Sequence, residues 1–159
     1  MPDALREEFD GYDWTPVRFP VGYGREALES LEFTGRHEDV VLFGPPGTGR
    51  THLAIALGRE AYREGTETRF SSAAGLAGRL LRAKTDNRLD KELAIIGKAG
   101  LPVIDELGYV PVDEEGSRLL FQVAANAYER QSAVFTTNIE SGGWGRVYGD
   151  PNTAAAIID

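Results

Sequence analysis

The chain has 159 residues, with 17 basic and 25 acidic side chains and a net charge of −8 at pH 7. This length predicts a chain able to bury roughly 70% of the surface it exposes when unfolded. Its longest apolar stretches, such as Ala154–Ile158, are far shorter than the roughly 18 residues of a membrane span, and its first ten residues are acidic rather than signal-like. We therefore expect a cytoplasmic protein with no membrane partner.

The absence of cysteine excludes disulfides, thiolate zinc sites and thiol nucleophiles. The two histidines, His37 and His52, are too few for a histidine-rich metal site. A metal, if one is used, is therefore expected to be a hard cation held by oxygen ligands, of which Mg²⁺ is the first choice.

Residues 1–35 mix aromatic residues with proline and glycine, so we expect a loop or linker with one short helix over Arg25–Phe33. From residue 36 onward, apolar runs alternate with segments of helical spacing. The expected strands are Val40–Phe43, Thr66–Phe70, Leu101–Ile104 and Ala133–Thr136, and the expected helices are Thr51–Glu64, Ala73–Ala83, Leu89–Lys98 and Asp113–Arg130. This alternation predicts an α/β fold, a three-layer α/β/α parallel sheet spanning residues 36–159.

The most informative motif is GPPGTGRT, which follows the first of these strands and opens the next helix. It matches the P-loop pattern G-x-x-x-x-G-K-[ST] at every fixed position except the lysine, which is replaced by Arg50. Glycines let the backbone N–H groups approach phosphate oxygens, the helix start favours an anion, and the Thr51 hydroxyl is a ligand for Mg²⁺. The predicted nucleotide-binding residues are Gly44, Pro45, Pro46, Gly47, Thr48, Gly49, Arg50, Thr51 and His52.

Two acids end the strand LPVIDE. Behind a P-loop, Asp105 is expected to hold Mg²⁺ through water and Glu106 to polarise the attacking water, although an acidic pair after a strand is by itself usually a solvated turn. Asn138 follows the last expected strand and is predicted to orient that water beside the γ-phosphate; by itself it would be a turn residue.

An acidic surface repels nucleic acid, so a DNA contact would have to use a local basic patch. The candidate segment runs from Arg79 to Lys98 and is interrupted by three acids. Its basic residues are Arg79, Arg82, Lys84, Arg88, Lys91 and Lys98. A solvated helix face explains the same charges equally well.

Together these motifs resemble the IstB-like AAA+ ATPases, helper proteins of bacterial insertion-sequence transposition that are related to the DnaC-type helicase loaders. The resemblance is carried by VLFGPPGTGRTHLAIALG, PVIDELGYVPVDEEGSRLLFQV, YERQSAVFTTN and WGRVYGDPNTAAAIID. It implies a sheet in which the P-loop strand lies beside the strand that precedes Asn138, with the Asp105 strand next. It also implies that the protein binds ATP with Mg²⁺, forms multimers on DNA and has a transposase as its partner. It also implies that the aromatic segment Phe9–Trp14 flanks the adenine, with a core-packing loop as the equal alternative.

Three departures from the resemblance affect the expected activity. Arg50 keeps the charge of the P-loop lysine but not its compact shape. The resemblance also implies that an arginine reaching a neighbouring subunit's ATP, and after it the last sheet strand, lie beyond Asp159. It further implies an N-terminal segment for partner or DNA contacts, which we expect this chain to lack. The P-loop strand should then be an edge, covered by the N-terminal loop or by a second chain.

Two hypotheses of different classes stay open, together with a third function that differs from the first only in its partner. One is an ATP- and Mg²⁺-binding domain that assists DNA transposition with impaired hydrolysis. The other is a degenerate nucleotide-binding or interaction module that does not hydrolyse ATP. Helicase loading would use the same site with a different partner. If the site is active, the expected reaction is ATP hydrolysis.

Overall fold

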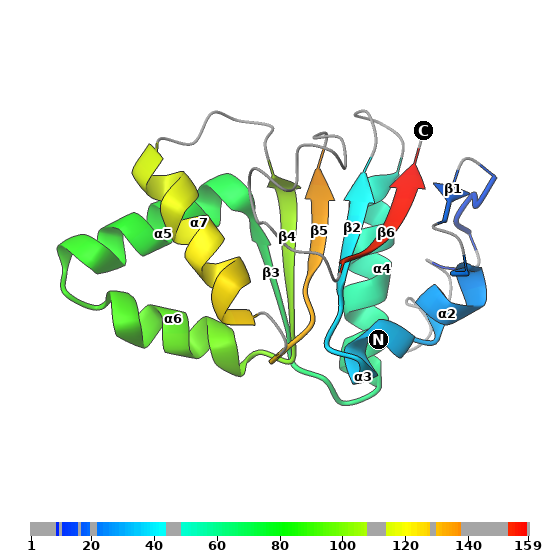
Figure 1. Cartoon of the computed structure of the whole chain (residues 1–159), viewed down its shortest axis with the longest axis horizontal. Helices are drawn as coiled ribbons and strands as arrows, with labels where there is room; N and C mark the ends of the chain where they lie inside the picture. Colours follow the sequence, from blue (N-terminus) through cyan, green and yellow to red (C-terminus); the bar gives the residue numbers. More distant parts are fainter. Residues whose placement is uncertain are drawn as a thin grey trace.

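The computed structural model describes residues 9, 11–15, 17–19, 22–43, 49–107, 114–127, 130–137 and 153–158. Within them, a six-stranded sheet has the order β1-β6-β2-β5-β4-β3 (Figure 1). The strands are β1 (Val17–Arg18), β2 (Asp39–Phe43), β3 (Thr68–Ser72), β4 (Leu101–Leu107), β5 (Val134–Thr137) and β6 (Thr153–Ile158). The helices are α2 (Arg25–Glu29), α3 (Glu32–Gly35), α4 (Arg50–Arg63), α5 (Ala73–Thr85), α6 (Leu89–Lys98) and α7 (Glu114–Ala127).

The strands β2 to β6 are parallel to one another, and β1 pairs with β6 in antiparallel fashion. The expected order is confirmed, because β5 lies beside β2 and β4 follows β5. All carboxyl ends of the parallel strands therefore meet at one edge of the sheet, where ligands of open α/β sheets bind.

Helices cover both faces of the sheet, so the predicted three-layer architecture is confirmed. Val40 and Leu42 of β2 pack with α2, α3 and α4, whereas Val41 packs with α5, α6 and α7 on the other face. This division follows from the period of two in a strand, and it explains why β2 is apolar from Val40 to Phe43. None of the described helices is long and apolar enough to cross a membrane.

The outer edge of β2 is covered by the end of the same chain. β6 pairs with β2 in parallel, from Asp39 opposite Thr153 to Phe43 opposite Ile157. The expectation that the last strand lies beyond Asp159, which would leave β2 as an edge covered by the N-terminal loop or a second chain, was therefore wrong. The alanine-rich segment 154–156 carries little strand propensity, so its pairing depends on the open backbone groups of β2.

The N-terminal part is more structured than expected. The single helix predicted over Arg25–Phe33 is two helices, because Leu31 adopts a left-handed backbone with φ 60° and breaks the helical path. This break brings the side chains of Leu28, Leu31 and Phe33 into one core with α4, and Phe9 joins the same core. The strand bounds also differ: β3 runs from Thr68 to Ser72 rather than from residue 66 to 70, and β4 continues through Asp105 to Leu107. The bounds of β2 and β5 differ from the expected ones by a single residue.

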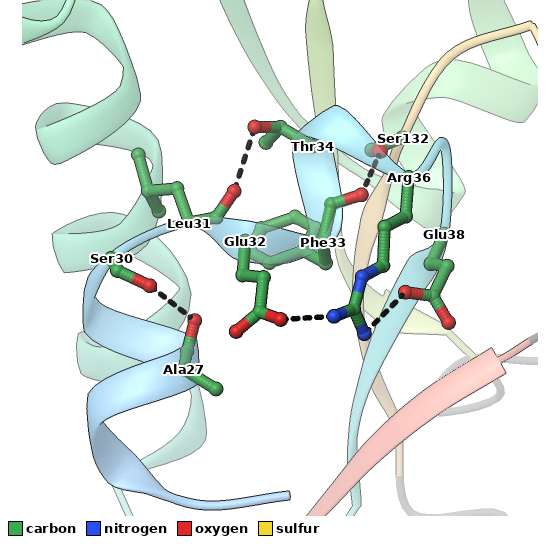
Figure 2. A network of polar contacts seen from close by, with 9 residues as sticks. All are labelled: Ala27, Ser30, Leu31, Glu32, Phe33, Thr34, Arg36, Glu38 and Ser132. Carbon is green, nitrogen blue, oxygen red and sulfur yellow. Dashed lines mark hydrogen bonds and ion pairs between the residues drawn. The ribbon is translucent and has the colours of Figure 1, made fainter.

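A network of polar contacts holds α2 and α3 against the sheet (Figure 2). Within the helices, the hydroxyl groups of Ser30 and Thr34 donate to backbone carbonyls one turn earlier. Between the elements, the buried Ser132 hydroxyl donates to the Phe33 carbonyl at 3.0 Å. Figure 2 also shows Arg36 between Glu32 and Glu38. The Ser132 contact joins the residues that precede β5 to a helix 99 positions earlier.

Replacing Ser132 with alanine is expected to lower the free energy of unfolding by about 1 kcal/mol, because one buried hydrogen bond is lost while the Phe33 carbonyl keeps the N–H groups of Arg36 and Glu38 as donors. Urea unfolding measures this change. Ser30→Ala is the matched control, since its hydroxyl bond is exposed and its loss is expected to cost at most about 0.5 kcal/mol. Equal losses for the two variants would contradict a special role of the Ser132 contact.

Candidate functional site

Among the described residues, no side chain caps the start of helix α4. Its N-cap residue is Gly49, with φ 90°, and no side chain accepts a cap hydrogen bond. No acidic residue lies in its first turn. By contrast, Ser72 caps α5, and α6 and α7 carry acids in their first turns. The start of α4 therefore differs from the other long helices in presenting donors and a positive dipole end to an external anion.

The first turn of α4 lies against the tip of β4. The Thr51 hydroxyl donates to the Asp105 carboxylate, with oxygen–oxygen distances of 3.0 and 3.2 Å to its two oxygens. Asp105 is 7% exposed and Thr51 is exposed, so their contact lies at the border between core and solvent. Residues 54 positions apart are thus brought together at the carboxyl end of the sheet.

Glu106 adopts an unusual backbone conformation beside this contact. Its φ is 61°, in the left-handed region that non-glycine residues rarely adopt, and its side chain is exposed. The register between β4 and β5 shifts between Ile104 and Leu107. The N–H group of Glu106 donates to the Thr136 hydroxyl at 2.8 Å. That hydroxyl in turn donates to the Asp105 carboxylate.

An aromatic cluster from the N-terminal segment lies on the other side of the α4 start. The Tyr12 ring lies 5.5 Å from the His52 ring and approaches Gly49 so closely that an added Cβ would lie 3.2 Å from it. Trp14 packs edge-on against Tyr12, and the Arg25 guanidinium lies 4.7 Å from the Trp14 ring centroid. The segment therefore touches the predicted phosphate loop at its last glycine.

Two polar atoms of this cluster are buried without a hydrogen-bond partner among the described residues, the Tyr12 hydroxyl and the Trp14 indole nitrogen. Burial, with a smaller contribution from the Asp13 carboxylate, raises the pKa of Tyr12 to about 12. The hydroxyl thus stays protonated at neutral pH and can donate. Buried polar groups are normally hydrogen-bonded, and a polar ligand bound beside this cluster would provide the acceptors for both donors.

Of the residues predicted from the motifs, six lie in the described part of the chain. The structure brings Gly49, Arg50, Thr51 and His52 together in the N-cap and first turn of α4, and Asp105 and Glu106 beside them at the end of β4. Arg50 is only 7% exposed. Gly44–Thr48 and Asn138 lie outside the described residues, although β5 ends directly before Asn138.

Two residues of this site were missed from the sequence. The sequence pattern indicates Thr136 only as part of a strand and Tyr12 only as part of an aromatic segment. A buried threonine at a strand end needs a partner for its hydroxyl, and that requirement was the available signal for Thr136. Nothing in the spacing of Tyr12 indicated its contact with Gly49.

The donor set fits Mg²⁺. Thr51 and Asp105 present hard oxygen atoms that face each other, and proteins bind Mg²⁺ through one or two such groups together with phosphate oxygens. No group of three or more histidine or acidic side chains capable of holding a metal occurs among the described residues. A cage supplied wholly by protein is therefore not formed there.

The sheet order, the glycine that opens α4 and the acid at the tip of β4 define the class of protein as one with a P-loop nucleotide-binding fold of the AAA+ type. Solved structures share it: the DnaC helicase loader superposes over all of both chains with a TM-score of 0.75 at 19% identity. DnaA from Aquifex aeolicus, with AMPPCP bound, covers 84% of this chain and 44% of its own with a TM-score of 0.66 at 22% identity.

The chain belongs to the family of IstB-like ATP binding proteins, which it matches over residues 8–159. One relative is the putative ATP-binding protein of insertion sequence IS232 from Bacillus thuringiensis subsp. berliner. It is 42% identical to this chain over 157 residues, which cover 97% of this chain and 62% of the relative. The corresponding protein of IS21 from Pseudomonas aeruginosa is 40% identical over 93% of this chain and 56% of its own length. The chain thus spans about three-fifths of the length of these relatives.

Proposed function

We propose that this chain binds ATP with Mg²⁺ at the start of α4 and assists DNA transposition as an IstB-like domain. The contact between Thr51 and Asp105 carries the proposal, because it joins the end of the P-loop motif to the acid expected to hold the metal. The uncapped start of α4 supplies the donors and dipole for the phosphates. Gly44–Thr48 would complete the phosphate site, and Asn138 would act as its sensor.

The aromatic cluster supports a place for the base. Tyr12 contacts Gly49 and His52, and its hydroxyl and the Trp14 indole nitrogen are two buried donors that have no hydrogen-bond partner in the described part of the chain. A purine offers ring nitrogens as acceptors and a face for stacking, so it would satisfy both donors. The cluster also packs on the core, so the two alternatives for Phe9–Trp14 are compatible.

When bound, Mg²⁺ would neutralise charge on the phosphates and orient them. Thr51 and Asp105 would hold it, and Glu106 at the solvent-exposed end of the bulge would polarise the attacking water. Arg50 favours the second candidate function, a nucleotide-binding module with little hydrolysis, because a planar guanidinium fits the space of an ammonium poorly.

The helices α5 and α6 support a DNA contact. All six basic residues of the segment from Arg79 to Lys98 are exposed. Lys84 and Arg88 have acidic partners, Glu115 and Asp86. Arg82, Lys91 and Lys98 form no ion pair with any described residue, so their charges are available for phosphates. Assembly with further copies and with a transposase belongs to the same proposal, and the names of the relatives, which assign them to insertion sequences, support a role in transposition.

The experiment for this part of the proposal is duplex-DNA binding by fluorescence anisotropy across a salt series, with ATP and Mg²⁺ present. The double variant Arg82→Ala/Lys91→Ala is expected to weaken binding severalfold and to reduce the slope against log salt by about 2, one for each lost phosphate contact. The control Arg36→Ala/Arg63→Ala removes two exposed charges from elements that pack on the opposite face of the sheet. Equal effects of the two pairs would mean that the segment is only a solvated helix face.

A further inference from the structure

One buried hydroxyl links both acids of the candidate site. Thr136 is 1% exposed and lies in β5, between β2 and β4. Its hydroxyl donates its proton to the Asp105 carboxylate and accepts the N–H group of Glu106 at 2.8 Å. A hydroxyl has one proton and two lone pairs, so a single group can serve both neighbours at once.

The register explains why this hydroxyl is needed. Ile104 pairs with Phe135 and Leu107 pairs with Thr137, so the two acids of β4 together face one residue of β5, Thr136. This count defines a β-bulge, in which the extra residue loses its regular ladder partner. The Thr136 side chain supplies the acceptor that the Glu106 N–H group would otherwise lack.

The bulge also carries backbone strain. The left-handed conformation of Glu106, φ 61°, costs of order 1–3 kcal/mol and persists only where surrounding contacts hold it. The hydrogen bond from Glu106 to Thr136 is such a contact, since it fixes the amide on the N-terminal side of the strained residue. The β-branched threonine has few χ1 rotamers, so its hydroxyl position is well defined.

We propose that Thr136 is a positioning residue: it sets the orientation of the Asp105 carboxylate toward Thr51 and holds the bulge that turns Glu106 to solvent. This inference rests on the proposed Mg²⁺·nucleotide site. A neighbouring threonine offers a contrast, because the Thr137 hydroxyl is equally buried but donates to the Leu107 carbonyl at 2.7 Å. The two residues differ in the described contacts mainly in whether they touch the acids.

The test measures the affinity of a fluorescent ADP analogue in EDTA and across a Mg²⁺ titration. Thr136→Val is expected to keep the affinity in EDTA within about twofold and to raise the half-saturating Mg²⁺ concentration about 10- to 100-fold, the usual cost of removing a group that orients a metal ligand. Thr136→Ser, which keeps the hydroxyl, should restore the Mg²⁺ response. Thr137→Val should leave it unchanged. Thr136→Ala, which adds no bulk, replaces the valine variant if that variant does not fold.

Hydrogen exchange gives a second readout that needs no nucleotide. The Glu106 amide should exchange faster in Thr136→Val than in Thr137→Val, because only the former loses its acceptor. An unchanged Mg²⁺ response in Thr136→Val, or an equal loss in Thr136→Ser, would overturn the role of Thr136 while leaving the nucleotide site intact. If the unmodified chain bound no nucleotide under either condition, the proposed function would fail first, and the positioning role would fail with it.

Discussion

Replacing Arg50 with lysine is expected to raise the rate of phosphate release from ATP by about 10- to 100-fold. Both side chains are cationic, but lysine is a compact ammonium on a flexible stem, whereas arginine is a rigid planar fork. Arg50 is the first residue of α4 and only 7% exposed, so a guanidinium there has little room to adjust. Misplacement of a reacting group by about 1 Å can cost about 10²-fold in rate. Steady-state phosphate release with saturating ATP and Mg²⁺ measures the gain.

The affinity for ATP should change less than the rate, because the charge is kept. Glu106→Gln in the Arg50→Lys background is the matched control, and it should lower the rate to that of the unmodified chain or below it, since a positioned base contributes about 10²–10⁴-fold. Rapid, DNA-stimulated turnover by the unmodified chain, with no gain from lysine, would show that Arg50 does not limit hydrolysis.

The second large effect is expected from Asp105→Asn. This change keeps the shape and a hydrogen-bond acceptor for the Thr51 and Thr136 hydroxyls but removes the negative charge. Loss of a charged Mg²⁺ ligand should raise the half-saturating Mg²⁺ concentration by at least about 10- to 100-fold. That is the loss of metal affinity typical when a group that only orients a metal ligand is removed. A Mg²⁺ titration at fixed nucleotide concentration measures it.

Asp39→Asn is the control for this variant. Asp39 lies at the beginning of β2, is 9% exposed, and accepts the N–H group of Ala133 at 2.9 Å. Its carboxylate thus serves the sheet at the end opposite to the candidate site. We expect its loss to lower stability without altering the Mg²⁺ response. A Mg²⁺ response equally weakened by both variants would indicate general destabilisation rather than loss of a metal ligand.

The order of the central strands could be predicted from the sequence because the P-loop motif and the acidic strand end each fix a position in a known arrangement. β6 could not be found in this way. Its segment 154–158 is apolar, but three alanines give no clear strand propensity. Its pairing partner, the free edge of β2, becomes evident only when the sheet is assembled. The break at Leu31 was likewise hidden, since leucine favours helices and a left-handed leucine depends on tertiary packing.

Within the site, the pairing of Thr51 with Asp105 was predictable, because both residues are expected at the carboxyl edge of a parallel sheet. The role of Thr136 was not. It depends on a bulge that places two residues of β4 opposite one of β5, and a register shift of this kind leaves no mark on the hydrophobic pattern of the strand. Side-chain contacts that depend on local register therefore cannot be predicted from the sequence pattern.

The most direct test of the nucleotide site is equilibrium binding of ATP to the unmodified chain, measured by titration calorimetry with Mg²⁺ and again with EDTA. We expect saturable binding at one site, strengthened by Mg²⁺. Heat changes indistinguishable from dilution in both conditions would contradict the central claim that the start of α4 and the tip of β4 together bind a nucleotide with its metal.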